Sequence, residues 1–166
     1  VTGVPTCALP IYDFFARESE NGLKSAVNLG RVMHELLCRI ITKSDEQKAI
    51  AELFQTGQLT AQEKAIVRKE MEMFWQLVEQ TDWFEPQWQV MNEQTIILPE
   101  GVTRRPDRLM LQGDEAVIVD YKFGHILKPE YKTQVAEYML LMSQMGYRVK
   151  GYLCYVNLKQ IIPVML

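Results

Sequence analysis

Two aspartates and a lysine lie at the ends of a segment that has the pattern of a β-hairpin. Asp107 precedes one apolar run and Asp120 follows a second, with the turn residues Gln112-Gly-Asp-Glu115 between the runs. The residue before the first strand of a hairpin and the residue after its second strand lie at the same open end, so Asp107 and Asp120 are expected to be neighbours. Lys122 stands two positions beyond Asp120 and falls on the same face if the strand continues.

Two carboxylates held this close repel each other, which raises a pKa unless a cation lies between them. Carboxylate oxygens are ligands that Mg²⁺ and Mn²⁺ prefer, and a lysine beside them can interact with a phosphate or an attacking water. The three residues therefore indicate a divalent-metal site for phosphate chemistry. On their own they also fit a surface hairpin with solvated charges, because Asp and Lys are common at strand ends.

Further motifs accompany this hairpin along the chain. Val117-Ile-Val-Asp-Tyr-Lys122 is followed by Tyr131-Lys-Thr-Gln-Val-Ala-Glu-Tyr138, and Gly30-x-x-x-His-x-x-Leu37 precedes both. With Arg105-Pro-Asp107 they closely resemble the RecB/AddA-type nuclease domain of the PD-(D/E)xK superfamily, which is found at the C-terminus of UvrD-like helicase–nucleases. The resemblance spans roughly residues 28 to 156 and involves several separated motifs in the right order.

The resemblance implies a role for each matching residue. Asp107, Asp120 and Lys122 would be catalytic. The implied metal ligands are His34, Glu93, Asp107, Asp120 and the backbone carbonyl of Tyr121. Gln134 and Tyr138 are four residues apart on one helical face. Gln134 would orient Lys122 or a nucleotide, and Tyr138 would contact the backbone or pack under the site, as substrate-binding or supporting residues.

The implied activity is hydrolysis of DNA phosphodiester bonds with Mg²⁺ or Mn²⁺, with exonuclease action expected, in double-strand-break repair and recombination. The implied partners are DNA, a helicase region of the same parent chain and a second subunit, in the cytoplasm. The alternative is a catalytically inactive DNA-binding module of the same fold, although such modules usually lose an aspartate or the lysine. A glycosidase with a carboxylate pair would have no use for Lys122.

Composition agrees with one globular domain. The chain has 166 residues, 48% of them hydrophobic, and no stretch apolar enough to span a membrane. Its net charge of −3 does not indicate nucleic-acid binding, but a bound metal adds positive charge that a residue count omits. Cys7, Cys38 and Cys154 are scattered, which favours free thiols in a reducing compartment over a metal or iron–sulfur site.

The residue pattern divides the chain into three parts. Residues 1–11 are predicted to be an extraneous or disordered leader, residues 12–84 the helical part of the domain, and residues 85–166 an α/β core that is truncated at its C-terminus. The expected fold class is α/β, with a restriction-endonuclease-like mixed sheet flanked by helices. The chain is therefore interpreted as a fragment of a longer protein.

Apolar periodicity and turn residues predict the individual elements. Helices are expected over Val27–Ile41, Asp45–Gln55 with Ser44 as N-cap, Thr60–Thr81 with a capping box, and Pro129–Met145. Strands are expected over Pro86–Val90 and Gln94–Leu98, paired around a turn near Asn92, and over Arg108–Gln112, Ala116–Val119, Arg148–Val156 and Gln160–Leu166.

Three further expectations concern single side chains. Trp75, Trp83 and Trp88 are expected to pack in the core rather than stack on bases. His34 on an apolar helix face would ordinarily be a packed core residue, whereas with the resemblance Gly30, one turn earlier, lets a strand or metal approach it closely. His125 is expected at the surface or facing DNA.

Overall fold

The computed structural model describes residues 20–97 and 103–166, with side chains for residues 29–95 and 105–166. Its helices are α1 (Glu20–Leu37), α2 (Glu46–Gln55), α3 (Ala61–Val78) and α4 (Pro129–Gln144), with a short 3₁₀ helix, η1 (Lys43–Asp45), before α2. Its strands are β1 (Gln89–Asn92), β2 (Ile96–Ile97), β3 (Thr103–Arg104), β4 (Arg108–Gln112), β5 (Glu115–Lys122), β6 (Arg148–Tyr155) and β7 (Gln160–Val164). The leader predicted at residues 1–11 lies outside the described residues.

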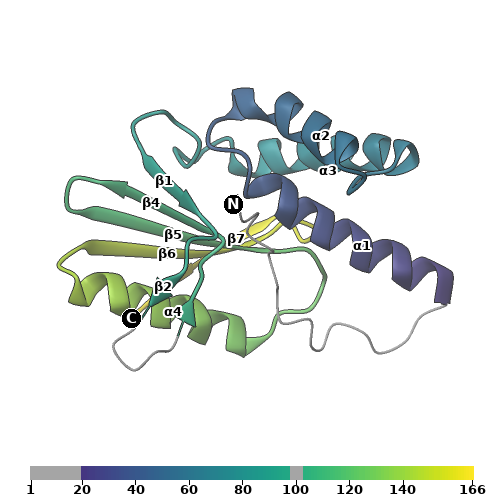
Figure 1. Cartoon of the computed structure of the whole chain (residues 1–166). Coiled ribbons are helices and arrows are strands. Elements are labelled where there is room, and N and C mark those ends of the chain that lie inside the picture. The colour runs from purple at the N-terminus through teal and green to yellow at the C-terminus, as the bar shows by residue number, and fades with distance from the viewer. Residues whose placement is uncertain (1–19, 98–102) are drawn as a thin grey trace.

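Five of these strands form a mixed sheet in the order β1-β4-β5-β6-β7. Strands β5 and β6 are parallel, and every other neighbouring pair in this sheet is antiparallel. A parallel pair needs a crossover connection, which α4 supplies. The sheet lies between α1–α3 on one face and α4 on the other (Figure 1). The predicted α/β fold class, a restriction-endonuclease-like mixed sheet flanked by helices, is thus confirmed.

Side chains of β5 alternate between the two helical layers, as the period of a strand requires. Val117 and Val119 belong to the apolar cluster shared with α1–α3, whereas Ala116 and Ile118 belong to the cluster shared with α4. On the α4 side, Gly151 of β6 lies so close to the helix that a Cβ there would overlap the Met139 sulfur. Helix α4 therefore rests directly on the sheet, at a depth set by this glycine.

The hairpin of β4 and β5 forms as expected, with Gln112 opposite Glu115 at the turn. Gly113 has φ +59, the positive value that the first central residue of a tight hairpin turn adopts when it is glycine. The capping box of α3 is also confirmed, since the Thr60 hydroxyl accepts from the Glu63 amide and the Glu63 carboxylate accepts from the Thr60 amide. Trp83 and Trp88 are buried in the core, and Trp75 is partly buried against it.

The predicted pairing of the first two strands is wrong. β1 begins at Gln89 rather than Pro86, because the Trp88 amide and ring close a turn onto the Glu85 and Asp82 carbonyls. β1 then pairs with β4, while β2 pairs with β3 in a separate two-stranded ribbon.

Helix boundaries differ from the predicted ones as well. Helix α1 starts earlier and ends at Leu37, where the amides of Arg39 and Ile40 bond three residues back instead of four. The predicted N-cap Ser44 lies inside η1, and Asp45 occupies the N-cap position of α2. No helix in the described part of the chain combines the length and apolar character that crossing a bilayer requires.

Arg108, the first residue of β4, is fully buried in the layer of α1–α3. Its Nη1 donates to the Ile40 carbonyl at 2.8 Å, and its Nη2 donates to the carbonyls of Ile41 at 2.7 Å and Trp83 at 2.8 Å. The guanidinium also stacks on the Phe84 ring, 4.1 Å from its centroid. One side chain thus ties the segment after α1 and the segment before β1 to the start of β4.

Replacing Arg108 with Met is expected to lower the free energy of unfolding by ~3 kcal/mol or more, because three carbonyls, two of them in buried hydrogen bonds, would lose their donor. Arg148→Met is the matched control, since Arg148 is exposed and pairs with Asp114 at the surface. Urea unfolding monitored by far-UV circular dichroism measures both. Equal losses in the two variants would show that the buried bonds of Arg108 are not important for stability.

Candidate active site

Three acidic residues form a row across neighbouring strands. In the register of β1 with β4 and of β4 with β5, the positions just beyond the last pairs are Glu93 opposite Asp107 and Asp107 opposite Asp120. The Glu93 amide donates to the Asp107 carbonyl at 3.1 Å, which extends the β1–β4 pairing by this step. Directly opposed residues face the same side of a sheet. The alternation along β5 makes this the side of α4.

Asp107 is at the centre of the row. Its Oδ2 accepts a hydrogen bond from the Tyr121 amide at 2.8 Å and lies 3.5 Å from His34 Nδ1. In an extended strand the N–H and C=O of one residue point to the same edge, so the Tyr121 carbonyl also points to the edge where Asp107 lies. The Phe123 ring contacts the imidazole edge-on, with centroids 5.0 Å apart, and holds His34 in place.

His34, Glu93 and Asp107 together have the geometry of a metal site. Each offers one ligand atom, and the three atoms lie within 4.8 Å of one another. Ligands about 2.1 Å from a shared ion lie at most roughly 4.2 Å apart, so only small side-chain shifts separate this cluster from a coordinating arrangement. Two carboxylates and one imidazole suit Mg²⁺ or Mn²⁺, so the residues present fit a divalent cation.

Glu93 is held by an unusual backbone conformation. Its φ of +50° lies in the left-handed region, which costs a non-glycine residue roughly 1 kcal/mol or more. This conformation ends β1 and turns the chain toward β2. Arg105 Nε lies 3.4 Å from Glu93 Oε2, so an arginine adjoins the carboxylate. Strain of this kind is typical of functional positions.

Asp120 and Lys122 form a separate pair on the same face. Asp120 is only 2% exposed. Its Oδ2 lies 2.5 Å from Lys122 Nζ, so the two side chains form an ion pair. The geometry of this contact is not that of a hydrogen bond. Lys122 Nζ also lies over the Tyr131 ring of α4, 4.2 Å from its centroid. The ammonium is therefore fixed between a buried carboxylate and an aromatic face.

Helix α4 forms the wall above this pair. The Gln134 amide donates to the Tyr138 hydroxyl at 2.8 Å, and that hydroxyl donates to the Arg105 carbonyl at 3.3 Å. Tyr138 thus contacts the protein backbone two residues before Asp107. These bonds tie α4 to the segment that carries the central aspartate.

The electrostatics of the site favour a bound cation. Burial raises the pKa of Asp107 to about 6, against the opposing charge of Lys122. Burial and the negative charge of Asp107 raise the pKa of Asp120 to about 6 as well. Burial lowers the pKa of His34 to about 4, so its imidazole is neutral at pH 7 and able to bind a metal.

Lys122 stays charged in this environment. Burial acts to lower its pKa, but the negative charges of Asp120 and Asp107 outweigh burial and hold the pKa above its ordinary value. A permanently protonated lysine cannot accept a proton at neutral pH. Its contribution is a fixed positive charge and hydrogen-bond donors.

The structure brings the predicted site residues to one end of the sheet. These are His34, Glu93, Asp107, Asp120, Tyr121 and Lys122, with Gln134 and Tyr138 on the adjoining helix. Sequence reasoning missed Tyr131 and Phe123 as supports, although Tyr131 precedes Gln134 by three residues and so shares its helix face. A glycine at position 30 is not required for the chain after β5 to approach α1, because a Cβ there would lie 3.5 Å from the Phe123 Cβ, an ordinary contact.

A family model for the PD-(D/E)XK nuclease superfamily matches residues 11–163 of the chain. The chain belongs to this superfamily, whose members are nucleases that use divalent metals. The match covers both the helices that supply His34 and the strands that supply the acidic row. No curated protein matches the sequence.

Without metal, Asp107 is expected to destabilise the fold increasingly as pH rises. A carboxyl group with a raised pKa binds more protons when folded than when unfolded between about pH 4 and pH 6, so its contribution to stability falls across that window. Relative to Asp107→Asn, the protein in EDTA should therefore lose ~2 kcal/mol between pH 4 and pH 7. His34, whose lowered pKa gives the opposite dependence on pH, is present in both proteins.

Urea unfolding at several pH values measures this difference, and excess Mn²⁺ at pH 7 should stabilise only the parent chain. Asp114→Asn is the control, because Arg148 lowers the pKa of that exposed carboxyl and its dependence on pH has the opposite sign. A difference for Asp107→Asn that does not vary with pH would contradict the burial of a charged carboxylate there.

Proposed function

We propose that this chain hydrolyses DNA phosphodiester bonds with a divalent metal, at the site formed by the acidic row and Lys122. The observation that carries the proposal is the cluster of His34, Glu93 and Asp107, whose ligand atoms lie within 4.8 Å of one another, at the sheet end where Lys122 pairs with Asp120. A surface hairpin with solvated charges would leave these groups exposed, whereas Asp120 is almost fully buried and Asp107 is 12% exposed.

Each residue has a role that follows from its surroundings. His34, Glu93, Asp107, Asp120 and the Tyr121 carbonyl would hold the cation, with Mg²⁺ or Mn²⁺ favoured by the oxygen ligands. The chemistry that such an ion supplies when bound is a lower pKa for water and neutralised charge on the phosphate.

Lys122 would donate hydrogen bonds to the attacking water or to a phosphate oxygen, where negative charge develops in the transition state. Gln134 and Tyr138 would hold α4, and with it the Tyr131 ring beneath Lys122, against the segment that carries Asp107. The role of the helix is therefore positional.

We further propose that the domain is of the RecB/AddA type, acts as an exonuclease and serves double-strand-break repair and recombination. Its partners would be a helicase region of the same parent chain and a second subunit. The contact of His34 with Asp107 and the Gln134–Tyr138 bond support this, because both belong to the motifs that carry that resemblance. Cytoplasmic location is proposed because the three cysteines are scattered along the sequence, a pattern that favours a reducing compartment.

Residues 12–84 and 85–166 are proposed to be the helical part and the α/β core of one nuclease domain. The apolar cluster that helices α1–α3 share with β4, β5 and β6 supports this division into parts rather than domains.

Lys122→Met and Asp120→Asn are each expected to reduce Mn²⁺-dependent cleavage of linear DNA at least ~100-fold, because each removes a charge from the reacting centre. Lys128→Met is the matched control, since Lys128 is on the same segment and its Nζ lies 6.0 Å from the Tyr131 ring. Release of labelled nucleotides with Mn²⁺, with Mg²⁺ and with EDTA measures cleavage. Full activity in either test variant, with a native melting curve, would contradict the site.

The exonuclease proposal predicts that linear DNA is degraded and a covalently closed circle is left intact. A supercoiled plasmid and the same plasmid linearised at one site, incubated with Mn²⁺ and separated on a gel, distinguish the two outcomes. Nicking of the circle would show endonuclease action. Binding of linear DNA without cleavage in any metal would favour the alternative, a catalytically inactive DNA-binding module.

A further inference from the structure

A groove lies in the helical layer, away from the acidic row. It has a volume of about 600 Å³ and is bounded by η1, α2, the C-terminal half of α3 and the turn at residues 81–85. The acidic row and Lys122 lie on the α4 side of the sheet, and His34, which α1 contributes to the nuclease site, does not line the groove, so the two are separate. None of the residues that line this groove takes part in the proposed hydrolysis.

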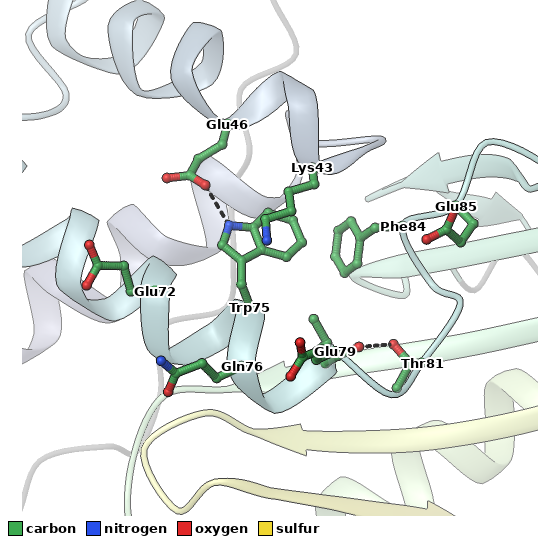
Figure 2. A pocket seen from close by; sticks show the side chains of 10 residues that line it. Lys43, Glu46, Glu72, Trp75, Gln76, Glu79, Thr81, Phe84 and Glu85 are labelled. Carbon is green, nitrogen blue, oxygen red and sulfur yellow. Dashed lines mark hydrogen bonds between the residues drawn. The ribbon is translucent and has the colours of Figure 1, made fainter.

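The groove combines aromatic walls with acidic side chains. Figure 2 shows the Trp75 ring beside Phe84 at its centre, with carboxylates placed around them. The acidic and aromatic residues that line it are Glu46, Glu72, Glu79, Glu85, Trp75 and Phe84. Lys43 is the one cationic residue among its described lining residues. The net charge of the lining is therefore strongly negative.

Two of these carboxylates extend into solvent near the rings. Glu79 and Glu85 are exposed, while Glu46 Oε2 accepts a hydrogen bond from the Trp75 indole at 2.6 Å. That bond orients the Trp75 ring and fixes one face of it toward the groove (Figure 2). A rigid aromatic ring beside solvent-exposed carboxylates is an arrangement that attracts an organic cation.

Cations of the chain itself already contact both aromatic walls. Lys43 Nζ lies 5.4 Å from the Trp75 ring centroid, within the groove (Figure 2). Arg108 stacks on Phe84 from the interior, 4.1 Å from the ring centroid. These contacts are independent of the acidic residues, and they indicate the same ligand chemistry, a cation on an aromatic face.

We propose that this groove binds an arginine side chain from a basic segment of a partner protein. A guanidinium can lie flat on Trp75 and donate hydrogen bonds from its edge to the Glu79 or Glu85 carboxylate, which a compact ammonium does less well. Nucleic acid is excluded as the occupant by the negative charge of the lining. The groove would thus attach a protein partner on the face opposite the nuclease site.

A blocked peptide with two arginines, and its counterpart with citrulline in place of arginine, tests this with the whole chain. Trp75 lines the groove, whereas the other two tryptophans are buried, so tryptophan fluorescence reports on the groove. The arginine peptide should change the fluorescence with a saturating curve that weakens at high salt, and the neutral citrulline peptide should not. Equal responses to the two peptides would overturn the proposal.

The doubly substituted variant Glu79→Lys, Glu85→Lys should weaken binding of the arginine peptide about tenfold, because two attractive charges become repulsive. Glu52→Lys, an exposed substitution on α2 outside the groove, is the control. The milder pair Glu79→Gln, Glu85→Gln should weaken binding in the same direction and covers the case in which the lysines disturb folding.

Two further outcomes would also overturn the proposal. One is unchanged affinity in the glutamine pair. The other is Mn²⁺ alone producing the same fluorescence change and displacing the peptide, which would show an acidic surface that collects cations of any kind. Asp107→Asn should bind the peptide normally, so loss of nuclease activity and loss of peptide binding are distinguishable.

Discussion

The arrangement of the site depends on one buried cation. The guanidinium of Arg108 has no carboxylate among the groups that accept its hydrogen bonds, which are backbone carbonyls and the Asn92 amide oxygen. Burial lowers its pKa, yet an arginine keeps its charge, so the carbonyls must stay in place around it. Because Asp107 immediately precedes Arg108 in the chain, the contacts that fix Arg108 also fix the centre of the acidic row. The layer of α1–α3 is held to the sheet at the position where His34 meets Asp107.

The opposite face of the sheet carries the opposite charge. There the fold buries two carboxylates whose pKa values are both raised, and Lys122 offsets only part of their repulsion. Burying these charges lowers the free energy of unfolding, and the two packed apolar clusters offset this loss. A cation at the proposed site would offset this repulsion, so the fold is expected to be more stable with the ion than without it.

The sequence predicted the site to the extent that its geometry is local. Asp107, Asp120 and Lys122 lie on one hairpin, so alternation and turn residues were enough to bring them together. Glu93 needed the resemblance, because its place beside Asp107 comes from the pairing of β1 with β4, and the residues themselves favoured pairing β1 with β2. Arg108 could not be found from the sequence, since a lone arginine at a strand start is ordinarily exposed and two of its carbonyl partners, Ile40 and Ile41, lie more than 60 positions away. Positive φ at Glu93 likewise follows from tertiary context.

The position of the three acidic residues on separate strands also determines when in folding the proposed active site becomes complete. The β4–β5 hairpin closes through two turn residues and can form early, whereas β1 must pair with β4 across an intervening ribbon and α1 must dock from far along the chain. A partly folded chain that has only the hairpin therefore carries two of the three acids and no imidazole. The proposed active site is in this sense a property of the finished topology, and no single local segment carries it.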